Sequence, residues 1–470
     1  MTDVDALLGR IDRELDAARE RLFAWLRIPS ISAEPAHSGD CRRAAGWLCD
    51  ELAGLGFSAS VRETAGHPVV LGHHPGPGGD VPHLLFYGHY DVQPPDPLEL
   101  WTSPPFEPAL VEGPHGPRLV ARGAVDDKGQ TMMWLEAFRA WQAVGGGLPV
   151  RVTVLVEGEE EVGSPSLAAF LDANRGELGA DVVVISDTGM WDIDTPAITT
   201  RLRGSTYVEI GLRLAERDMH SGLFGGSAQN AANVLTRILG GLHDAGGGVA
   251  LPGFYDGILP PSPAVLAQWA ALGFDEAAFL GTVGLRTPAG ERDRPALERL
   301  WARPTADITG IWSGYTGPGA KTVIPAEAHA KVSFRLVPGQ DPDAVLASLE
   351  RFVAARLPPE AQVRYDKLFR GRGLEIPADS FWVNAATRVL HDEYGRTPVL
   401  MGSGGSIPVV EMMKNVLGLD CLLVGFGLND DQVHSPNEKF EMRCFRQGTR
   451  FHARLLAAIA AGQMTMPPTA

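Results

Sequence analysis

The chain has 470 residues, of which 41 are Lys or Arg and 57 are Asp or Glu, so its formal net charge is −16 at pH 7. Hydrophobic residues make up 44% and charged residues 21%, which is typical of a globular protein and excludes a disordered one. The acidic balance also argues against nucleic acid or an anionic membrane surface as a partner, because both attract basic patches.

The chain begins with helical patterns. Apolar residues at helical spacing predict one helix over residues 5–28 and another over 42–55. The acidic, amphipathic start does not resemble a secretory signal, and no apolar run reaches the ~18 residues that span a bilayer. The four cysteines are too sparse for a disulfide framework, so we expect reduced thiols and a cytoplasmic protein.

Short apolar runs then alternate with helical segments. Strands are predicted over residues 83–87, 150–156, 181–185 and 421–424, with a helix over 129–144. Continuously apolar strands that alternate with helices are typical of an α/β fold, in which helices sandwich a mostly parallel sheet. We expect residues 1–200 and 379–470 to form this discontinuous domain.

The pattern changes between these two stretches. Alternating strands are predicted over residues 205–214, 328–336 and 362–368, with helices over 230–242 and 341–357. This texture predicts an α+β domain over residues 201–378 that is inserted into the first domain. The loop-rich stretch 246–304 gives no clear element.

Polar clusters follow the strands of the first domain. In an open α/β sheet, ligands bind beyond the carboxyl ends of the strands. The clusters lie at residues 88–91, 123–128, 157–161, 186–188 and in the loop that reaches His434. We therefore expect them to meet at one edge of the sheet.

Two imidazoles and three carboxylates from these clusters form a candidate metal site. They belong to His89, Asp126, Glu161, Asp187 and His434. Nitrogen and oxygen ligands in this mixture suit Zn²⁺ or Mn²⁺, whereas Ca²⁺ takes oxygen alone. Two divalent ions would nearly balance the three carboxylates and a bound hydroxide, so the charges favour a dinuclear site.

Two neighbouring acids have candidate roles beside the ligands. Asp91 can accept the second N–H of the His89 imidazole and fix its tautomer. Glu160 can take a proton from a metal-activated water. Taken singly, each signal has an ordinary explanation, because a Glu triplet is usually a solvated face and an Asp pair before a helix usually caps it. Their joint placement at strand ends favours the metal site.

The motifs resemble those of the dinuclear zinc peptidase family that includes carnosine dipeptidase, the glutamate carboxypeptidases and aminoacylase. Within it, the resemblance is to the cytosolic non-specific dipeptidase branch. It rests on residues 86–95 (FYGHYDVQPP), 122–129 (RGAVDDKG), 157–164 (EGEEEVGS), 218–222 (DMHSG), 314–319 (GYTGPG), 335–338 (RLVP), 404–408 (GGSIP) and 434–438 (HSPNE).

The resemblance implies a hydrolase with two metal ions per subunit, Zn²⁺ first and Mn²⁺ or Co²⁺ as alternatives. Asp126 would bridge both ions, with His89 and Asp187 completing one and Glu161 and His434 the other. Glu160 would be the general base, Asp91 would orient His89, and the peptide bond after Asp126 would be cis.

For the inserted domain, the resemblance implies a lid and a homodimer interface. His220 and Thr322 would be donated in trans to the partner's active site, where His220 stabilises the oxyanion. Arg335 would bind the carboxylate of a small peptide substrate, and Gly405 and Ser406 would help to seat it.

One departure concerns the substrate. Residues 402–403 are Gly-Ser, where this branch often has Arg-Glu. The expected activity is therefore dipeptide hydrolysis, with N-acyl amino-acid amidohydrolysis, as in a deacylase or desuccinylase, as the alternative. A further alternative is an inactive relative that only binds.

Overall fold

The computed structural model describes residues 3–405 and 407–462. It divides the chain into two compact units. Unit 1 consists of Met1–Thr200, Ile376–Met401 and Pro408–Ala470, and unit 2 consists of Arg201–Glu375 and Gly402–Ile407. Among the described residues, no helix combines the length and the apolar character needed to cross a membrane.

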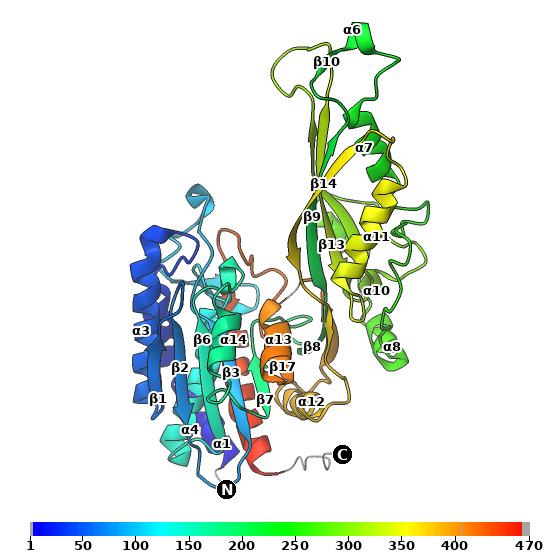
Figure 1. Cartoon of the computed structure of the whole chain (residues 1–470). Helices are drawn as coiled ribbons and strands as arrows, with labels where there is room; N and C mark the ends of the chain where they lie inside the picture. Colours follow the sequence, from blue (N-terminus) through cyan, green and yellow to red (C-terminus); the bar gives the residue numbers. More distant parts are fainter. Residues whose placement is uncertain (1–2, 406, 463–470) are drawn as a thin grey trace. The chain divides into compact units, whose positions relative to one another are not determined.

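The core of unit 1 is a mixed sheet whose inner strands are parallel (Figure 1). Its strands run in the order β1-β2-β6-β3-β7-β17-β8. β3 pairs in parallel with β6 and β7, and β17 pairs in parallel with β7. The bounds are β1 Ser58–Arg62, β2 Val69–His74, β3 His83–His89, β6 Arg151–Glu157, β7 Val182–Ile185, β8 Ala197–Leu202 and β17 Cys421–Leu423.

These inner strands form because their side chains are apolar on both faces. In β3, residues 84–87 are all buried, and β7 is buried along its whole length. Parallel strands that are covered on both faces have this continuous apolar sequence. The predicted α/β class with a mostly parallel sheet is confirmed.

A smaller antiparallel sheet joins two distant segments of unit 1. Its order is β18-β5-β4, with β4 at Ala109–Gly113, β5 at Gly116–Val120 and β18 at Lys439–Glu441. Lys439 lies opposite Val120 in this register. The segment before Asp126 is thereby fixed beside the segment after His434.

Helices flank the main sheet (Figure 1). The segment predicted as one helix over 5–28 divides at Glu14, where φ −98° and ψ 7° leave the helical region. Helix α4 carries Trp134 and Phe138, whose rings lie 5.6 and 5.1 Å from that of Phe86 in β3. The α-helices are α1 Val4–Arg13, α2 Leu15–Leu26, α3 Ser38–Gly54, α4 Lys128–Gly145, α5 Leu167–Ala173, α12 Phe381–Tyr394, α13 Pro408–Met412 and α14 Met442–Ala460. Shorter helical segments are the 3₁₀ helices η1 Pro35–His37, η2 Leu98–Leu100 and η3 Glu160–Val162 and the π-helix η4 Met413–Leu417.

Unit 2 contains a four-stranded antiparallel sheet in the order β11-β13-β9-β14. A separate two-stranded pair joins β10 to β12. The strands of these two sheets are β9 Gly204–Arg213, β10 Met219–His220, β11 Thr305–Ser313, β12 Val323–Ile324, β13 Glu327–Leu336 and β14 Gln362–Arg370. Two further strands, β15 Leu374–Glu375 and β16 Val399–Ser403, both pair with β8 in the main sheet.

The unit 2 helices are α6 Ser221–Phe224, α7 Ala231–Gly240, α8 Pro263–Ala271, α9 Glu276–Gly281, α10 Ala296–Trp301 and α11 Pro342–Ala354. Asp341 caps α11 by accepting from the N–H of Asp343, and Pro342 occupies the first turn. Buried residues of α7 and α11, such as Leu235 and Leu349, share one apolar core with β9 and β13.

The stretch 246–304, for which no clear element was predicted, contains the three short helices α8, α9 and α10. Ser262 and Asp275 cap the first two by accepting backbone N–H groups. They are six to nine residues long, which is too short for a helical period to stand out.

Candidate metal centre

The parallel strands bring the predicted metal ligands to one edge of the unit 1 sheet. His89 is the last residue of β3, Glu161 lies in η3 just after β6, and Asp187 follows β7. Asp126 lies just before α4, and His434 lies between β17 and β18. Because β6, β3, β7 and β17 are adjacent and parallel, their carboxyl ends meet at this edge.

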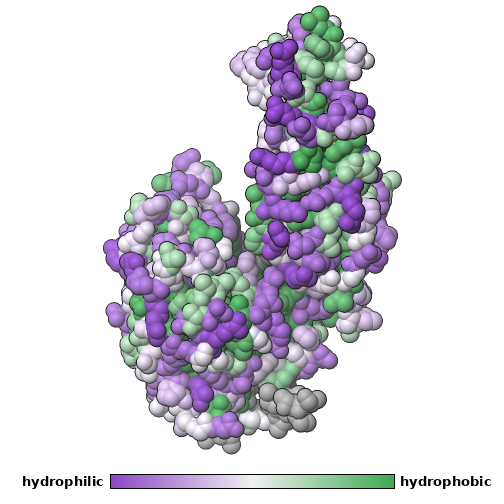
Figure 2. Space-filling model, viewed as in Figure 1, coloured by the Kyte–Doolittle hydropathy of each residue, from purple (hydrophilic) through white to green (hydrophobic). Residues whose placement is uncertain are grey.

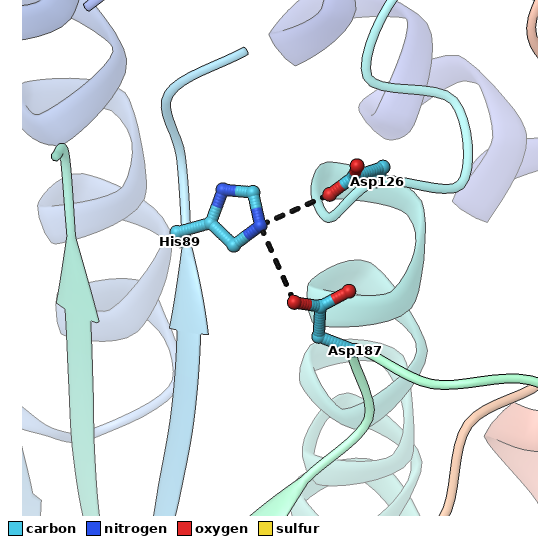
Figure 3. Close-up of side chains that lie close together, drawn as sticks. All are labelled: His89, Asp126 and Asp187. Atoms are coloured by element: carbon cyan, nitrogen blue, oxygen red, sulfur yellow. Dashed lines mark ion pairs between the residues drawn. The ribbon is translucent and has the colours of Figure 1, made fainter. Parts of the chain in front are cut away.

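The first group of side chains consists of His89, Asp126 and Asp187 (Figure 3). Nε2 of His89 lies 3.1 Å from Oδ1 of Asp126 and 3.7 Å from Oδ2 of Asp187. The ligand atoms of the three residues all lie within 4.8 Å of one another. Figure 3 shows all three side chains pointing toward a common point.

The second group consists of Asp126, Glu161 and His434. Nε2 of His434 lies 3.0 Å from Oδ2 of Asp126 and 3.1 Å from Oε2 of Glu161. Asp126 thus presents Oδ1 to the first group and Oδ2 to the second. This is the arrangement needed for one carboxylate to serve two ions.

The chemistry of this donor set fits divalent cations. Nε2 of His89 is buried and has no well-aligned hydrogen-bond partner among the described residues, although two carboxylates face it. Burial alone would lower the pKa of His89, but Asp126, Asp187 and Asp91 together raise this pKa well above its usual value. The cluster therefore attracts positive charge, which protons on the imidazoles or bound metal ions can supply.

Asp91 contacts both His89 and the turn after β6. Its backbone carbonyl oxygen lies 3.1 Å from Nδ1 of His89, and its carboxylate Oδ1 lies at 3.4 Å. The same carboxylate accepts hydrogen bonds from the backbone N–H groups of Glu160 and Glu161. The carbonyl oxygen of Asp91 is thus its atom nearest to Nδ1 of His89, and its carboxylate holds the Glu160–Glu161 turn.

Glu160 lies beside the same cluster. Burial raises its pKa to about 8, and the negative charges of Asp187, Glu161 and Asp126 add to this effect while His89 opposes it. A carboxyl group with a raised pKa in such a site has the properties of a general base and acid. Bound cations would oppose the rise in pKa, because they add positive charge nearby.

Sequence reasoning gave no role to two further side chains at this edge. Nε2 of Gln93 donates to Oε2 of Glu161 at 2.9 Å, and Oδ2 of Asp127 accepts from the backbone N–H of His89 at 3.2 Å. The peptide bond between Asp126 and Asp127 is cis, as the resemblance implied. Both residues lie within the polar motifs after β3 and before α4, and their position in those motifs is the feature from which a role could have been predicted.

The predicted substrate-binding residues lie in unit 2. His220 ends β10, and the backbone N–H of Ser221 donates to the carbonyl of Thr322 at 3.1 Å, so the two predicted residues lie close together. Arg335 lies on β13 opposite Ser205 of β9. Gly405 donates its backbone N–H to Oγ of Ser403, and Ser406 lies outside the described residues.

A parallel sheet that gathers imidazoles and carboxylates in two groups around a shared Asp has the ligand set of the two-metal sites that metal-dependent hydrolases use. The sequence matches peptidase family M20/M25/M40 over residues 85–458, and the chain belongs to this family.

Similar proteins match almost the whole chain. The Cys-Gly metallodipeptidase dug1 of Schizosaccharomyces pombe is 29% identical over 97% of this chain and 98% of its own length. The human Beta-Ala-His dipeptidase is also 29% identical, over 96% of this chain and 91% of its own. The solved structure of the dipeptidase Dug1p from Saccharomyces cerevisiae has a TM-score of 0.81 at 26% identity, covering 98% of this chain and 100% of that chain.

Proposed function

We propose that this protein is a metal-dependent dipeptidase. The observation that carries the proposal is the pair of ligand groups that share Asp126, with one carboxylate oxygen directed to each. The two similar proteins named above, which match this chain from end to end, are both named as dipeptidases. The structure of human carnosine dipeptidase 1 matches with a TM-score of 0.78 at 28% identity, over 98% of this chain and 100% of that chain.

His89, Asp126 and Asp187 would hold one ion, and Asp126, Glu161 and His434 the other. Two divalent ions in these positions would polarise the scissile carbonyl and lower the pKa of the attacking water. Two imidazoles among the five ligands favour Zn²⁺, and Mn²⁺ or Co²⁺ suit the same donors. Asp91 keeps the His89 ring in orientation through the contacts at Nδ1.

Glu160 moves the proton in this proposal. As the general base it takes a proton from the attacking water, and as the general acid it delivers that proton to the leaving amine. The Asp91 carboxylate fixes the backbone at Glu160 and so directs its side chain. Glu160 lies next in the chain to the ligand Glu161, which keeps the base close to the ions.

Substrate binding is assigned to unit 2. Arg335 has the planar guanidinium that pairs with a peptide carboxylate through two hydrogen bonds. Gly405 and Ser406 would help to seat that end of the substrate, and His220 would donate a hydrogen bond to the oxyanion.

We infer a homodimer in which His220 and Thr322 act in the partner's site. Both residues are exposed, and α6, which follows His220 directly, exposes Leu223 and Phe224 by 78% and 44%. Figure 2 shows hydrophobic surface at the end of unit 2, where Figure 1 places α6. Apolar side chains exposed beside a polar functional residue are typical of an interface.

A cytoplasmic location fits the thiols of the chain. Cys41, Cys49, Cys421 and Cys444 are all free. Burial raises the pKa of Cys41 and Cys421 to about 12, which disfavours the reactive thiolate.

The experiment is a substrate panel assayed with and without a chelator. Dipeptides with a free amino terminus are compared with N-acetyl and N-succinyl amino acids of the same C-terminal residue. The proposal expects hydrolysis of the dipeptides that chelation abolishes and Zn²⁺, Mn²⁺ or Co²⁺ restores. Preference for the acylated substrates would instead support an amidohydrolase, and activity that survives complete metal removal would contradict both.

A further inference from the structure

The carboxylate of Glu438 is surrounded by hydrogen-bond donors from one short segment. Oε1 accepts from the backbone N–H groups of Val125 at 2.9 Å and Asp126 at 3.1 Å. Oε2 accepts from the backbone N–H of Gly123 at 2.9 Å and from Nη1 of Arg122 at 2.8 Å. Four donors thus converge on one side chain, and all of them belong to the segment that carries the shared ligand.

This contact is buried. Glu438 is 0% exposed and Arg122 is 1% exposed. The guanidinium of Arg122 also donates to the carbonyl of Pro94 and lies 5.5 Å from the ring centroid of Trp101. A buried carboxylate with its lone pairs satisfied and a paired cation keeps one geometry, because any shift leaves a buried polar group without a partner.

Glu438 also belongs to the chain segment that carries His434, a ligand of the second group. It lies four residues after His434 and directly before β18, which pairs with β5. The N–H of Ala121 donates to the carbonyl of Glu438, so backbone and side chain of this residue both bind the segment that leads to Asp126. Asn437, next in the chain, accepts from Thr102 and donates to the carbonyl of Leu100, which fixes this end of the loop.

We propose that Glu438 is a positioning residue that sets the spacing between Asp126 and His434 and so creates the second metal position. This inference rests on the proposed dinuclear site. Glu438 holds no ion itself. It fixes the backbone at Asp126 while its own chain segment carries His434, so the two ligands are connected through a single carboxylate.

A Glu438→Gln substitution tests this with little change in size. A Gln side chain has one acceptor oxygen, and its NH₂ group would face either the N–H groups of Val125 and Asp126 or those of Gly123 and Arg122. The NH₂ group of Gln would then face N–H groups that also need an acceptor, so the segment of residues 122–126 must shift. Outer residues that orient metal ligands typically change metal affinity by about 10–100-fold when they are replaced.

Protein from which metal has been removed with a chelator is titrated with Co²⁺. The visible absorption of bound Co²⁺ measures how much of each added equivalent binds. Wild-type protein is expected to bind two ions, whereas E438Q is expected to bind its weaker ion about 10–100-fold less tightly than the wild type does. Glu136→Gln is the matched control, because Glu136 of α4 is a buried carboxylate that accepts hydrogen bonds from Arg21 of α2 and Arg139 of α4. E136Q is expected to lose stability but to bind both ions as the wild type does.

The outcomes separate this inference from the proposed function. If wild-type protein binds fewer than two ions, the dinuclear site is wrong and this inference fails with it. If wild type and E438Q both bind two ions with equal affinity, only the role of Glu438 is wrong. Should E438Q fail to fold, Arg122→Lys replaces it: weaker binding of the second ion supports the inference, and unchanged binding overturns it.

Discussion

His452 makes the stability of unit 1 depend on pH in a calculable way. The residue lies in α14, is fully buried, and packs against the rings of Phe86, Phe426 and Phe451. Nε2 lies 3.1 Å from Oγ of Ser186, and Nδ1 is buried without a hydrogen-bond partner in the described part of the chain. Because burial disfavours the imidazolium, the pKa of His452 falls from 6.5 to about 3.

The folded state therefore favours the neutral ring. The stability that His452 contributes is fully present above about pH 6.5, the unfolded pKa, and is lost progressively as the pH falls toward the folded pKa of about 3. Between pH 8 and pH 5, the predicted loss in the free energy of unfolding is about 2 kcal/mol, at 1.36 kcal/mol per pKa unit.

Urea denaturation at pH 8 and pH 5 measures this loss, with His452→Leu as the comparison. Leu removes the titrating group but keeps an apolar side chain, so the variant is destabilised at pH 8 by a cost that does not depend on pH. Other acid-labile groups, including the proposed metal ligands, contribute equally to both proteins and cancel in the difference. The reasoning is refuted if wild type and variant lose the same free energy between the two pH values.

Three further predictions concern the proposed active site. Glu160→Gln should lower kcat by about 10²–10⁴-fold with two metal ions still bound, and near wild-type turnover would remove its role as base. Arg335→Met should raise KM for dipeptides by about tenfold or more but leave C-terminally amidated peptides unaffected, so an equal effect on both would contradict carboxylate binding. Mixing inactive His220→Ala and Glu161→Ala subunits should restore part of the activity, because one site of the mixed dimer is intact. Absence of rescue, with subunit exchange verified, would argue against donation in trans.

The inner strands and the residues beyond them were predictable because each carries two independent signals. The buried runs at β3, β6 and β7 are apolar on both faces, which indicates parallel strands. β3 ends in His89, β6 ends in Glu157, and Asp187 comes two residues after β7. Polar side chains directly after buried strands point to the carboxyl edge of the sheet. The elements and the donor types at the site could therefore be predicted before any distance was known.

Other features depend on tertiary contacts that leave no local pattern. In β11 the pairing shifts between Ile308 and Gly310, which interrupts the alternation that marks a strand. The buried contact of the Glu438 carboxylate could not be predicted from the sequence, because its four donors lie more than 300 residues earlier in the chain. The contact of the Asp91 carbonyl with His89 is likewise a matter of backbone geometry.

The three-part construction of unit 1 has a consequence for how the protein is made. Translation delivers His89, Asp126, Glu161 and Asp187 before any of unit 2, whereas His434 and Glu438 follow only after Glu375 has been added. A nascent chain can thus assemble the first ligand group early, but the second group and helix α14 must wait until residues 434–460 have been added. Long-range pairing of this kind slows folding, because distant segments must meet before their contacts stabilise anything. A ribosome-bound chain that stops short of His434 would expose an incomplete, strongly acidic sheet edge to the cell.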